Sequence, residues 1–321
     1  MPNTHRARTR FRLLIATAAA LMLDGAFAAA QDNATKARLW KDPGAIDTLD
    51  LFWGSGAAER APKAPFAFLE EDTSGTQPKI RVRDADGRQW DVKFGEEVHA
   101  EIAANRLVWA LGYVVEEMYF VPGGVITGMT AGRRTKDDVG ADGTFARARF
   151  RLRDETSERA ESRWTFESNP FVNTRELSGL AILMTMINNW DIQGTRNNRI
   201  LRIEGEDRYI VSDLGATFGK MGTGLVPRSK WNLEDFKKEE FIEKVENGMV
   251  DLDYEGYGGI NKVPVEHARW FASVVGQLTD SQVQAALRAA GAADAEVTGF
   301  SVRLVEKIRE LQKAVGSTPD P

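Results

Sequence analysis

The hydrophobic period of the sequence changes near residue 170, and this change limits the folds open to the chain. Before it, segments such as KIRVRD (79–84), RQWDVKFG (88–95) and ARARFRLRD (146–154) alternate apolar and polar residues, as strands do. A single helix at 96–111 interrupts this half and ends at Gly112. After the change, TRELSGLAILMTMINNW (174–190) begins a half with helices expected near 233–246, 264–278, 280–290 and 299–315.

We therefore predict an α+β fold of two lobes with a cleft between them. The N-lobe is expected at 65–170, with an antiparallel meander at 65–94, one key helix and a loop insertion at 122–143. Residues 155–170 are expected to form a charged linker. The mostly helical C-lobe is expected at 171–315, with one short hairpin. Residues 31–64 form an extension before the lobes, and 316–321 a tail.

The composition restricts the chemistry that any site can use. The chain of 321 residues contains no cysteine and only three histidines. Disulfides, thiolate zinc sites and cysteine nucleophiles are thereby excluded. Acid–base or metal chemistry must rest on carboxylates and amides, which favour hard cations such as Mg²⁺.

The first thirty residues are typical of a Sec-type signal peptide. A basic start is followed by an apolar run at 13–23 and by small residues before Gln31. We therefore expect export to the periplasm or secretion. Removing this segment takes four arginines and one aspartate from 42 basic and 47 acidic residues, which leaves a net charge near −8. That charge disfavours a nucleic-acid partner. No later stretch is long and apolar enough to span a membrane, so we expect no stable span after signal cleavage.

The candidate chemistry is concentrated between Asn188 and Gly215. Asp191 directly follows the apolar helix, a position from which a carboxylate can accept a hydroxyl proton. Asn197 and Asn198 follow in the same turn, and Asp213 comes after a β-branched run. Amide and carboxylate oxygens of this kind hold Mg²⁺ or Mn²⁺ in phosphoryl transfer. Taken singly, each residue is also compatible with an ordinary turn.

A second group lies in the strand-rich half. Lys93 ends the third strand of the meander between apolar neighbours, and Glu97 and Glu101 share one face of the following helix. Either glutamate can form an ion pair that directs the lysine toward phosphates, and Glu101 is the stronger candidate. The turn between the first two strands, SGTQPK (74–79), offers backbone N–H groups and hydroxyls to a phosphate.

These segments resemble a protein-kinase-like fold of the atypical sort. SGTQPK, VKFGEEVHAEIAANRL (92–107), NWDIQGTRNN (189–198) and SDLG (212–215) are similar to segments of HipA-like bacterial serine/threonine kinases, with phosphoinositide kinases as more distant relatives. The resemblance covers about residues 65–230. It implies that ATP binds with Mg²⁺ or Mn²⁺, and that Ser74, Gly75, Gln77, Lys79 and Lys93 contact the nucleotide.

The resemblance also implies roles for the remaining residues. Glu101 would orient Lys93, Asp191 would be the base or positioning residue, and Asp213 would bind metal. Family members place an asparagine five residues after the aspartate, whereas here Asn197 and Asn198 stand six and seven after it. Both therefore stay candidates for the second metal ligand.

The expected function is an exported kinase-like phosphotransferase that moves the γ-phosphate of ATP to a hydroxyl, Ser or Thr of a protein. A catalytically weak or inactive pseudokinase that binds a ligand or protein is the alternative. A kinase for a small molecule, lipid or glycan is a third possibility. The expected partners are a nucleotide and an unknown protein or small-molecule acceptor.

Overall fold

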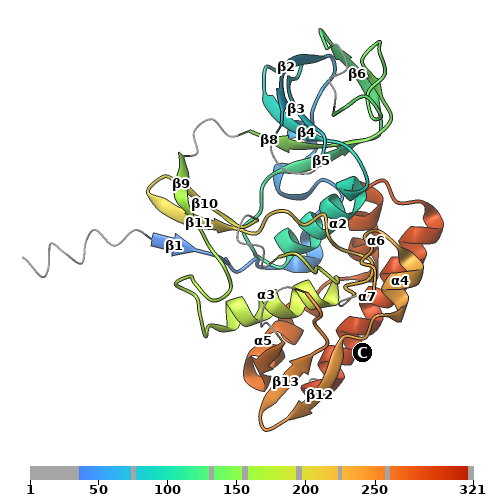
Figure 1. Cartoon of the computed structure of the whole chain (residues 1–321). Helices are drawn as coiled ribbons and strands as arrows, with labels where there is room; N and C mark the ends of the chain where they lie inside the picture. The colour runs from blue at the N-terminus through green and yellow to red at the C-terminus, as the bar shows by residue number, and fades with distance from the viewer. Residues whose placement is uncertain are drawn as a thin grey trace, which may run out of the picture.

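The computed structural model describes residues 36–73, 77–129, 134–153, 158–192, 197–222, 226–256 and 261–316. The predicted signal peptide, Ser74 and Gly75 of the phosphate turn, and 317–321 lie outside these ranges. The described chain forms two lobes, a sheet-built N-lobe at the top of Figure 1 and a mostly helical C-lobe below it.

The N-lobe is a seven-stranded sheet of order β5-β8-β4-β3-β2-β6-β7. Its strands are β2 (Phe66–Asp72), β3 (Lys79–Arg83), β4 (Gln89–Lys93), β5 (Met118–Val121), β6 (Gly124–Thr127), β7 (Thr144–Phe145) and β8 (Ala148–Leu152). The predicted antiparallel meander is confirmed as β2–β3–β4. The sheet is not wholly antiparallel, because β2 and β6 run parallel.

The key helix α2 (Glu97–Ala110) follows β4, as predicted. Gly112 ends this segment with a φ of 90°, and a Cβ there would lie 2.3 Å from the Lys41 carbonyl oxygen. Only glycine tolerates both conditions. The last turn of the helix is therefore fixed against the N-terminal extension.

The C-lobe contains five helices in the described residues, with two smaller sheets. The helices are α3 (Arg175–Met186), α4 (Leu233–Lys238), α5 (Val265–Val275), α6 (Asp280–Ala289) and α7 (Asp294–Ala314). One sheet has the order β1-β11-β10-β9, with β1 (Lys36–Arg38), β9 (Glu158–Arg163), β10 (Arg199–Ile203) and β11 (Glu206–Ile210). The other joins β12 (Ile242–Glu246), β13 (Met249–Leu252) and β14 (Lys262–Pro264).

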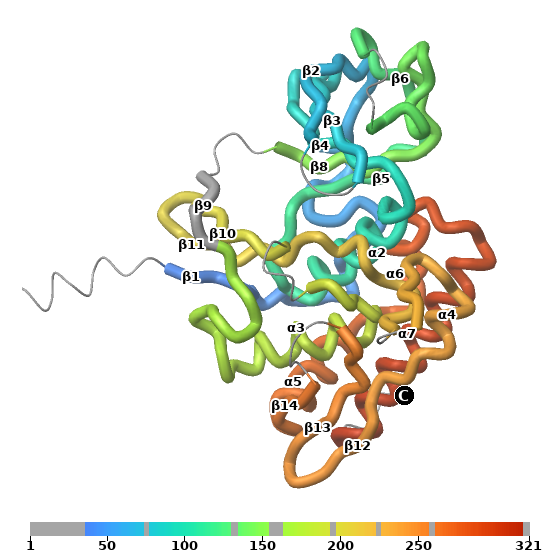
Figure 2. Tube along the Cα trace, viewed as in Figure 1, coloured from blue at the N-terminus to red at the C-terminus, as the bar shows by residue number. Residues whose placement is uncertain are grey.

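The extension at 31–64 is part of this lobe in its described portion. Strand β1 pairs in parallel with β11, and Leu39, Ile46 and Leu51 are buried in the larger core. Gln282 of α6 donates its side-chain amide to the Ile46 carbonyl at 2.6 Å. Three 3₁₀ turns, Ile46–Thr48, Gly54–Gly56 and Ala58–Arg60, then lead to the N-lobe. Figure 2 shows this path in blue, beneath the N-lobe sheet.

Three local predictions are wrong. The 122–143 insertion contains the sheet strand β6, and the 155–170 linker contains β9. The helix predicted at 233–246 ends at Lys238, after which β12 and β13 form a hairpin. Its turn is Asn247-Gly248, with φ values of 52° and 77°. A two-residue Asn-Gly turn with positive φ at both positions matches the twist of a hairpin, and here it outweighs the helical propensity of FKKEEFIEKVE.

Two hydrophobic cores support the lobes. The smaller one underlies the N-lobe sheet and is rich in aromatic rings, including Phe66, Trp90 and Phe150. The larger one fills the C-lobe and also takes in the apolar residues of α2, such as Ile102 and Leu107. Helix α2 thus packs on both lobes. None of the helices in the described ranges has the length and apolarity that a bilayer crossing requires. The predicted fold class, α+β with two lobes, is confirmed.

Candidate functional site

Lys93 is the centre of a buried ion cluster between β4, α2 and the segment after β11. It is the last residue of β4, and its side chain is 6% exposed. Its Nζ lies 2.8 Å from Glu101 Oε2, 3.0 Å from Glu97 Oε2 and 3.5 Å from Asp213 Oδ1. Strand β4 thus places the ammonium against both helix glutamates and Asp213.

Glu101 is shared by two cations. Arg149 of β8 stands opposite Lys93 in the sheet register, and its Nε lies 3.4 Å from Glu101 Oε2. Burial raises the pKa of Glu101, but Arg149 and Lys93 together outweigh it and hold that pKa at about 2. Burial also tends to lower the pKa of Lys93, but the negative charges of Glu101, Asp213 and Glu97 together outweigh it, so the pKa is raised. Both groups are therefore ionised at neutral pH.

Glu97 forms hydrogen bonds with residues from three segments of the chain. It accepts hydrogen bonds from Lys93 at 3.0 Å, from Lys230 at 2.9 Å, and from the Gln77 side-chain amide at 3.3 Å. Burial works against its charge, yet the two lysines lower its pKa. The end of the turn predicted to bind phosphate and the loop after Asp213 thus meet at one carboxylate.

Hydrogen bonds from side chains to backbone carbonyl oxygens connect the candidate residues between Asp191 and Asp213. Asn197 donates from Nδ2 to the Asp191 carbonyl oxygen at 2.6 Å, and Ser212 Oγ donates to the Asn197 carbonyl at 2.8 Å. Because Ser212 directly precedes Asp213, one hydrogen-bonded path joins Asp191 to Asp213. Asn198 points elsewhere: it is fully buried and donates to the Ile192 carbonyl at 2.8 Å.

Asp213 adopts a backbone conformation that few residues adopt. Its φ is 57°, in the left-handed region where Asn and Asp are the commonest non-glycine residues. Its side chain is 46% exposed, unlike the buried Lys93 beside it. Such local strain is retained where the surroundings demand it, often at functional sites. The carboxylate is therefore both fixed and accessible.

Asp191 has a perturbed carboxyl group. Burial raises its pKa, the hydrogen bond from Asn197 lowers it, and the negative charges of Asp213 and Glu97 raise it further, so that the net direction is upward. A carboxylate with a raised pKa accepts a proton more readily. This is the property that a general base needs.

The oxygen donors around Asp213 fit a divalent metal. Asn197 uses its amide nitrogen on the Asp191 carbonyl, which leaves its Oδ1 as a neutral ligand, and Asp213 supplies a carboxylate. The Oδ1 of Asn198 also has no hydrogen-bond partner, but Asn198 is fully buried and so less accessible to a metal than Asn197. Within the described residues no cluster of three or more His, Asp or Glu side chains forms a complete protein cage. Mg²⁺ characteristically keeps waters and substrate oxygens in its shell, so two protein ligands are compatible with it.

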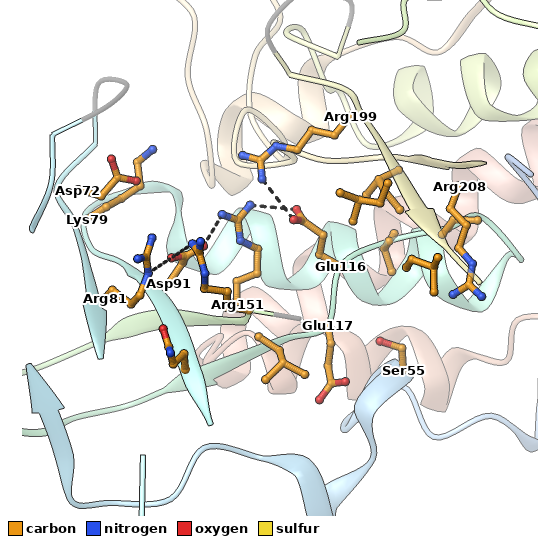
Figure 3. Close-up of a pocket in the computed structure, with 18 of the residues that line it drawn as sticks. Ser55, Asp72, Lys79, Arg81, Asp91, Glu116, Glu117, Arg151, Arg199 and Arg208 are labelled. Atoms are coloured by element: carbon orange, nitrogen blue, oxygen red, sulfur yellow. Dashed lines mark hydrogen bonds and ion pairs between the residues drawn. The ribbon is translucent and has the colours of Figure 1, made fainter. Parts of the chain in front are cut away.

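A large cleft lies between the lobes beside this cluster. Its volume is about 1220 Å³, and its walls come from β2, β3, β4 and β8 on one side and from β10 and β11 on the other, with residues 114–117 also lining it (Figure 3). Lys79 lines it, whereas Lys93, its register partner, lies just beyond the lining. Burial lowers the pKa of Lys79, although Asp72 opposes this. The cleft therefore borders the ion cluster on the side of β3.

The structure brings most of the predicted site residues together. Lys93 contacts both Glu101 and Asp213, Asp191 and Asn197 are connected to Asp213 through Ser212, and Gln77 and Lys79 border the cluster. Asn198 is buried outside it. Two contributors were missed. Arg149 is predictable only if β8 is paired with β4, and no sequence signal indicates Lys230.

The described chain is a two-lobed α+β protein in which these residues converge beside the cleft. No family model matches the sequence, and no curated protein does either. Among solved structures the chain is similar to the Golgi casein kinase, with a TM-score of 0.44 and 13% identity over 86% of this chain and 78% of that one. A second structure, the Golgi casein kinase with Mn/ADP bound, has a TM-score of 0.41 and 12% identity over 85% of this chain and 77% of that one.

Proposed function

We propose that this protein is a phosphotransferase that uses a nucleotide and Mg²⁺ or Mn²⁺ to phosphorylate a hydroxyl group. The observation that carries the proposal is the position of the Lys93 ammonium, 2.8 Å from Glu101 and 3.5 Å from Asp213. Asp213 is far from Lys93 and Glu101 in the sequence, and phosphoryl transfer needs all three in one place.

Each residue has a role that follows from its surroundings. Glu101, ionised and buried, holds the Lys93 ammonium at the edge of the cleft, where it can attract phosphate oxygens. Asn197 and Asp213 would hold the divalent metal, which neutralises the charge of the phosphates when bound. Asp191, with its raised pKa, would orient the acceptor hydroxyl and take its proton.

The finer points of the proposal rest on the sequence. The signal-peptide pattern at 1–30 supports export, and a serine or threonine of a protein is the proposed acceptor. Whether the signal is cleaved can be checked by N-terminal sequencing of the exported protein. An intact residue 1 in that protein would contradict the assignment.

The test is nucleotide binding by an Asp213→Ala variant. The shift in melting temperature caused by ATP with Mn²⁺ is expected in the wild-type protein and absent in the variant, because the carboxylate ligand is gone. Asp207→Ala is a matched control, since Asp207 forms a surface ion pair with Arg202 on the β10–β11 hairpin. An unchanged shift in melting temperature with ATP and Mn²⁺ in Asp213→Ala would contradict the proposal.

A binding module without turnover is the second candidate. One observation favours it: three carboxylates already surround the Lys93 ammonium, so phosphates must compete for it. Nucleotide binding without release of ADP, at saturating Mn²⁺ and across a panel of protein acceptors, would favour this candidate. Release of ADP that depends on Asp191 would exclude it.

A further inference from the structure

The wall of the cleft that would face the non-phosphate part of a ligand is charged. Thirteen of the 22 lining residues are Arg, Lys, Asp or Glu, and none is aromatic. Pockets for drug-sized ligands and cofactors are predominantly apolar and aromatic, with a few polar groups. This cleft reverses that proportion.

The charges form one continuous chain of ion pairs across the cleft (Figure 3). Glu70 pairs with Arg81, and Arg81 Nε lies 3.4 Å from Asp91 Oδ1. Arg151 then bridges Asp91 at 2.8 Å and Glu116 at 3.0 Å. The chain ends in the C-lobe, where Arg199 Nη1 of β10 lies 3.4 Å from Glu116 Oε1.

This chain lies next to the phosphate end of the site. Asp91 is two residues before Lys93, so both side chains emerge on the same face of β4. Arg81 stands opposite Asp91 on one side, and Arg151 on the other. A ligand whose phosphates reach Lys79 and a metal on Asp213 therefore continues beneath Arg81, Asp91 and Arg151.

A nucleobase gains little in such a place. Stacking and the hydrophobic effect reward a flat ring that covers apolar surface. The lining does include six aliphatic residues, Val114, Val115, Leu152, Leu201, Ile203 and Ile210. On the sheet side of the cleft, however, the ring would cover paired charges, and withdrawing water from them offsets the gain. Burial opposes the charge of Asp91, but Arg151 and the neighbouring arginines keep the pKa of this carboxyl lowered. The wall is thus held in its charged state.

We infer that the site binds its phosphoryl donor by the phosphate end and does not select the base. The donor class is any nucleoside triphosphate, and inorganic triphosphate as well. This inference rests on the proposed function. In the transfer, the acceptor oxygen bonds to the terminal phosphorus and the bridging P–O bond breaks. Its electron pair leaves on the diphosphate, and the hydroxyl proton passes to Asp191.

The test compares donors on the wild-type protein. ATP, GTP, UTP and inorganic triphosphate are titrated at equal Mn²⁺ by calorimetry, and their Kd values are expected to agree within about threefold, less than 1 kcal/mol. ATP binding about tenfold or more tightly than inorganic triphosphate overturns the inference but leaves the proposed function standing. Absence of binding by every donor overturns both.

A paired variant tests the cause. Arg81→Val with Asp91→Ala removes both partners of one ion pair, and Arg151, which loses Asp91, keeps its ion pair with Glu116. It should bind ATP more tightly relative to inorganic triphosphate than the wild type does. The control is Lys63→Ala with Asp86→Ala, a pair at 2.9 Å outside the cleft lining. An unchanged preference in a folded Arg81→Val/Asp91→Ala protein contradicts the role of the charged wall. The wild-type titrations decide the inference independently if this variant does not fold.

Discussion

Substitution of Glu101 by glutamine removes one negative charge from the buried cluster and almost no volume. The side chain lies between the Lys93 ammonium at 2.8 Å and Arg149 at 3.4 Å, and it is almost fully buried. The variant leaves two cations facing each other with a neutral amide between them. We expect both lower stability and weaker nucleotide binding.

The expected loss of stability can be worked out from the shift in the pKa of Glu101. The pKa of Glu101 is about 2 in the folded protein against an ordinary value of 4.5, and each tenfold change in proton affinity corresponds to about 1.4 kcal/mol. The charge therefore contributes ~3 kcal/mol to folding at neutral pH. Because the folded pKa is the lower one, this contribution is present above pH 4.5 and is lost as the pH falls toward 2.

Urea unfolding at several pH values measures the effect. The difference in the free energy of unfolding between wild type and Glu101→Gln should be ~3 kcal/mol at pH 7 and ~1 kcal/mol at pH 3. Glu96→Gln is the matched control, since Glu96 is exposed at the start of the same helix. Its effect should stay within about 0.5 kcal/mol at every pH.

Two results would refute this reasoning. A Glu101→Gln penalty that stays constant from pH 7 to pH 3 would mean that packing, not charge, is lost. A penalty below about 1 kcal/mol at pH 7 would mean that the desolvation of Glu101 cancels its attraction to both cations.

Three further predictions concern the loops and the C-lobe. Asn197→Ala should abolish the Mn²⁺-dependent shift in melting temperature. Asn198→Ala should lower the melting temperature but leave that shift in place. The reverse pattern would make Asn198 the metal ligand and Asn197 the structural residue. Burial lowers the pKa of Lys307 to about 7 from 10.5, so above pH 7 the unfolded chain holds more protons than the folded one and stability rises with pH. Lys307→Met should remove this rise, which is ~2 kcal/mol between pH 7 and 9 in the wild type. The same pH dependence of the free energy of unfolding in both proteins would contradict this prediction. Gly248→Ala should cost about 1 kcal/mol in urea unfolding because the φ of Gly248 is 77°, and a neutral result would mean that the hairpin turn relaxes.

The parts of the site that follow a regular period were predictable from the sequence. Lys93 ends an alternating strand, and Glu97 and Glu101 share a helix face, so their meeting needs no tertiary information beyond the turn between them. Their contact with Asp213 is different. It depends on how the segment after β11 returns under α2, which no local pattern specifies.

Other features depended on contacts that spacing does not reveal. Asn197 and Asn198 are adjacent and chemically identical, and they differ only in the folded chain, where Asn197 donates to the Asp191 carbonyl and the fully buried Asn198 donates to the Ile192 carbonyl. The Asn247-Gly248 hairpin was different, because its signal was present in the sequence and was overlooked beside helix-favouring charges. The charged wall of the cleft was likewise visible as alternating residues in β3 and β8, but its meaning required the strand register.

Helix α2 explains why the ion cluster is already assembled. Its apolar residues belong to the C-lobe core, so it is not carried by the N-lobe sheet alone. His99 donates from Nδ1 to the Ala290 carbonyl at 2.6 Å, and Thr217 Oγ1 donates to the Ala100 carbonyl at 3.3 Å. At the other end, Arg106 donates to the Met118 carbonyl at 2.7 Å. Moving Glu101 away from Lys93 would therefore unpack both lobes at once.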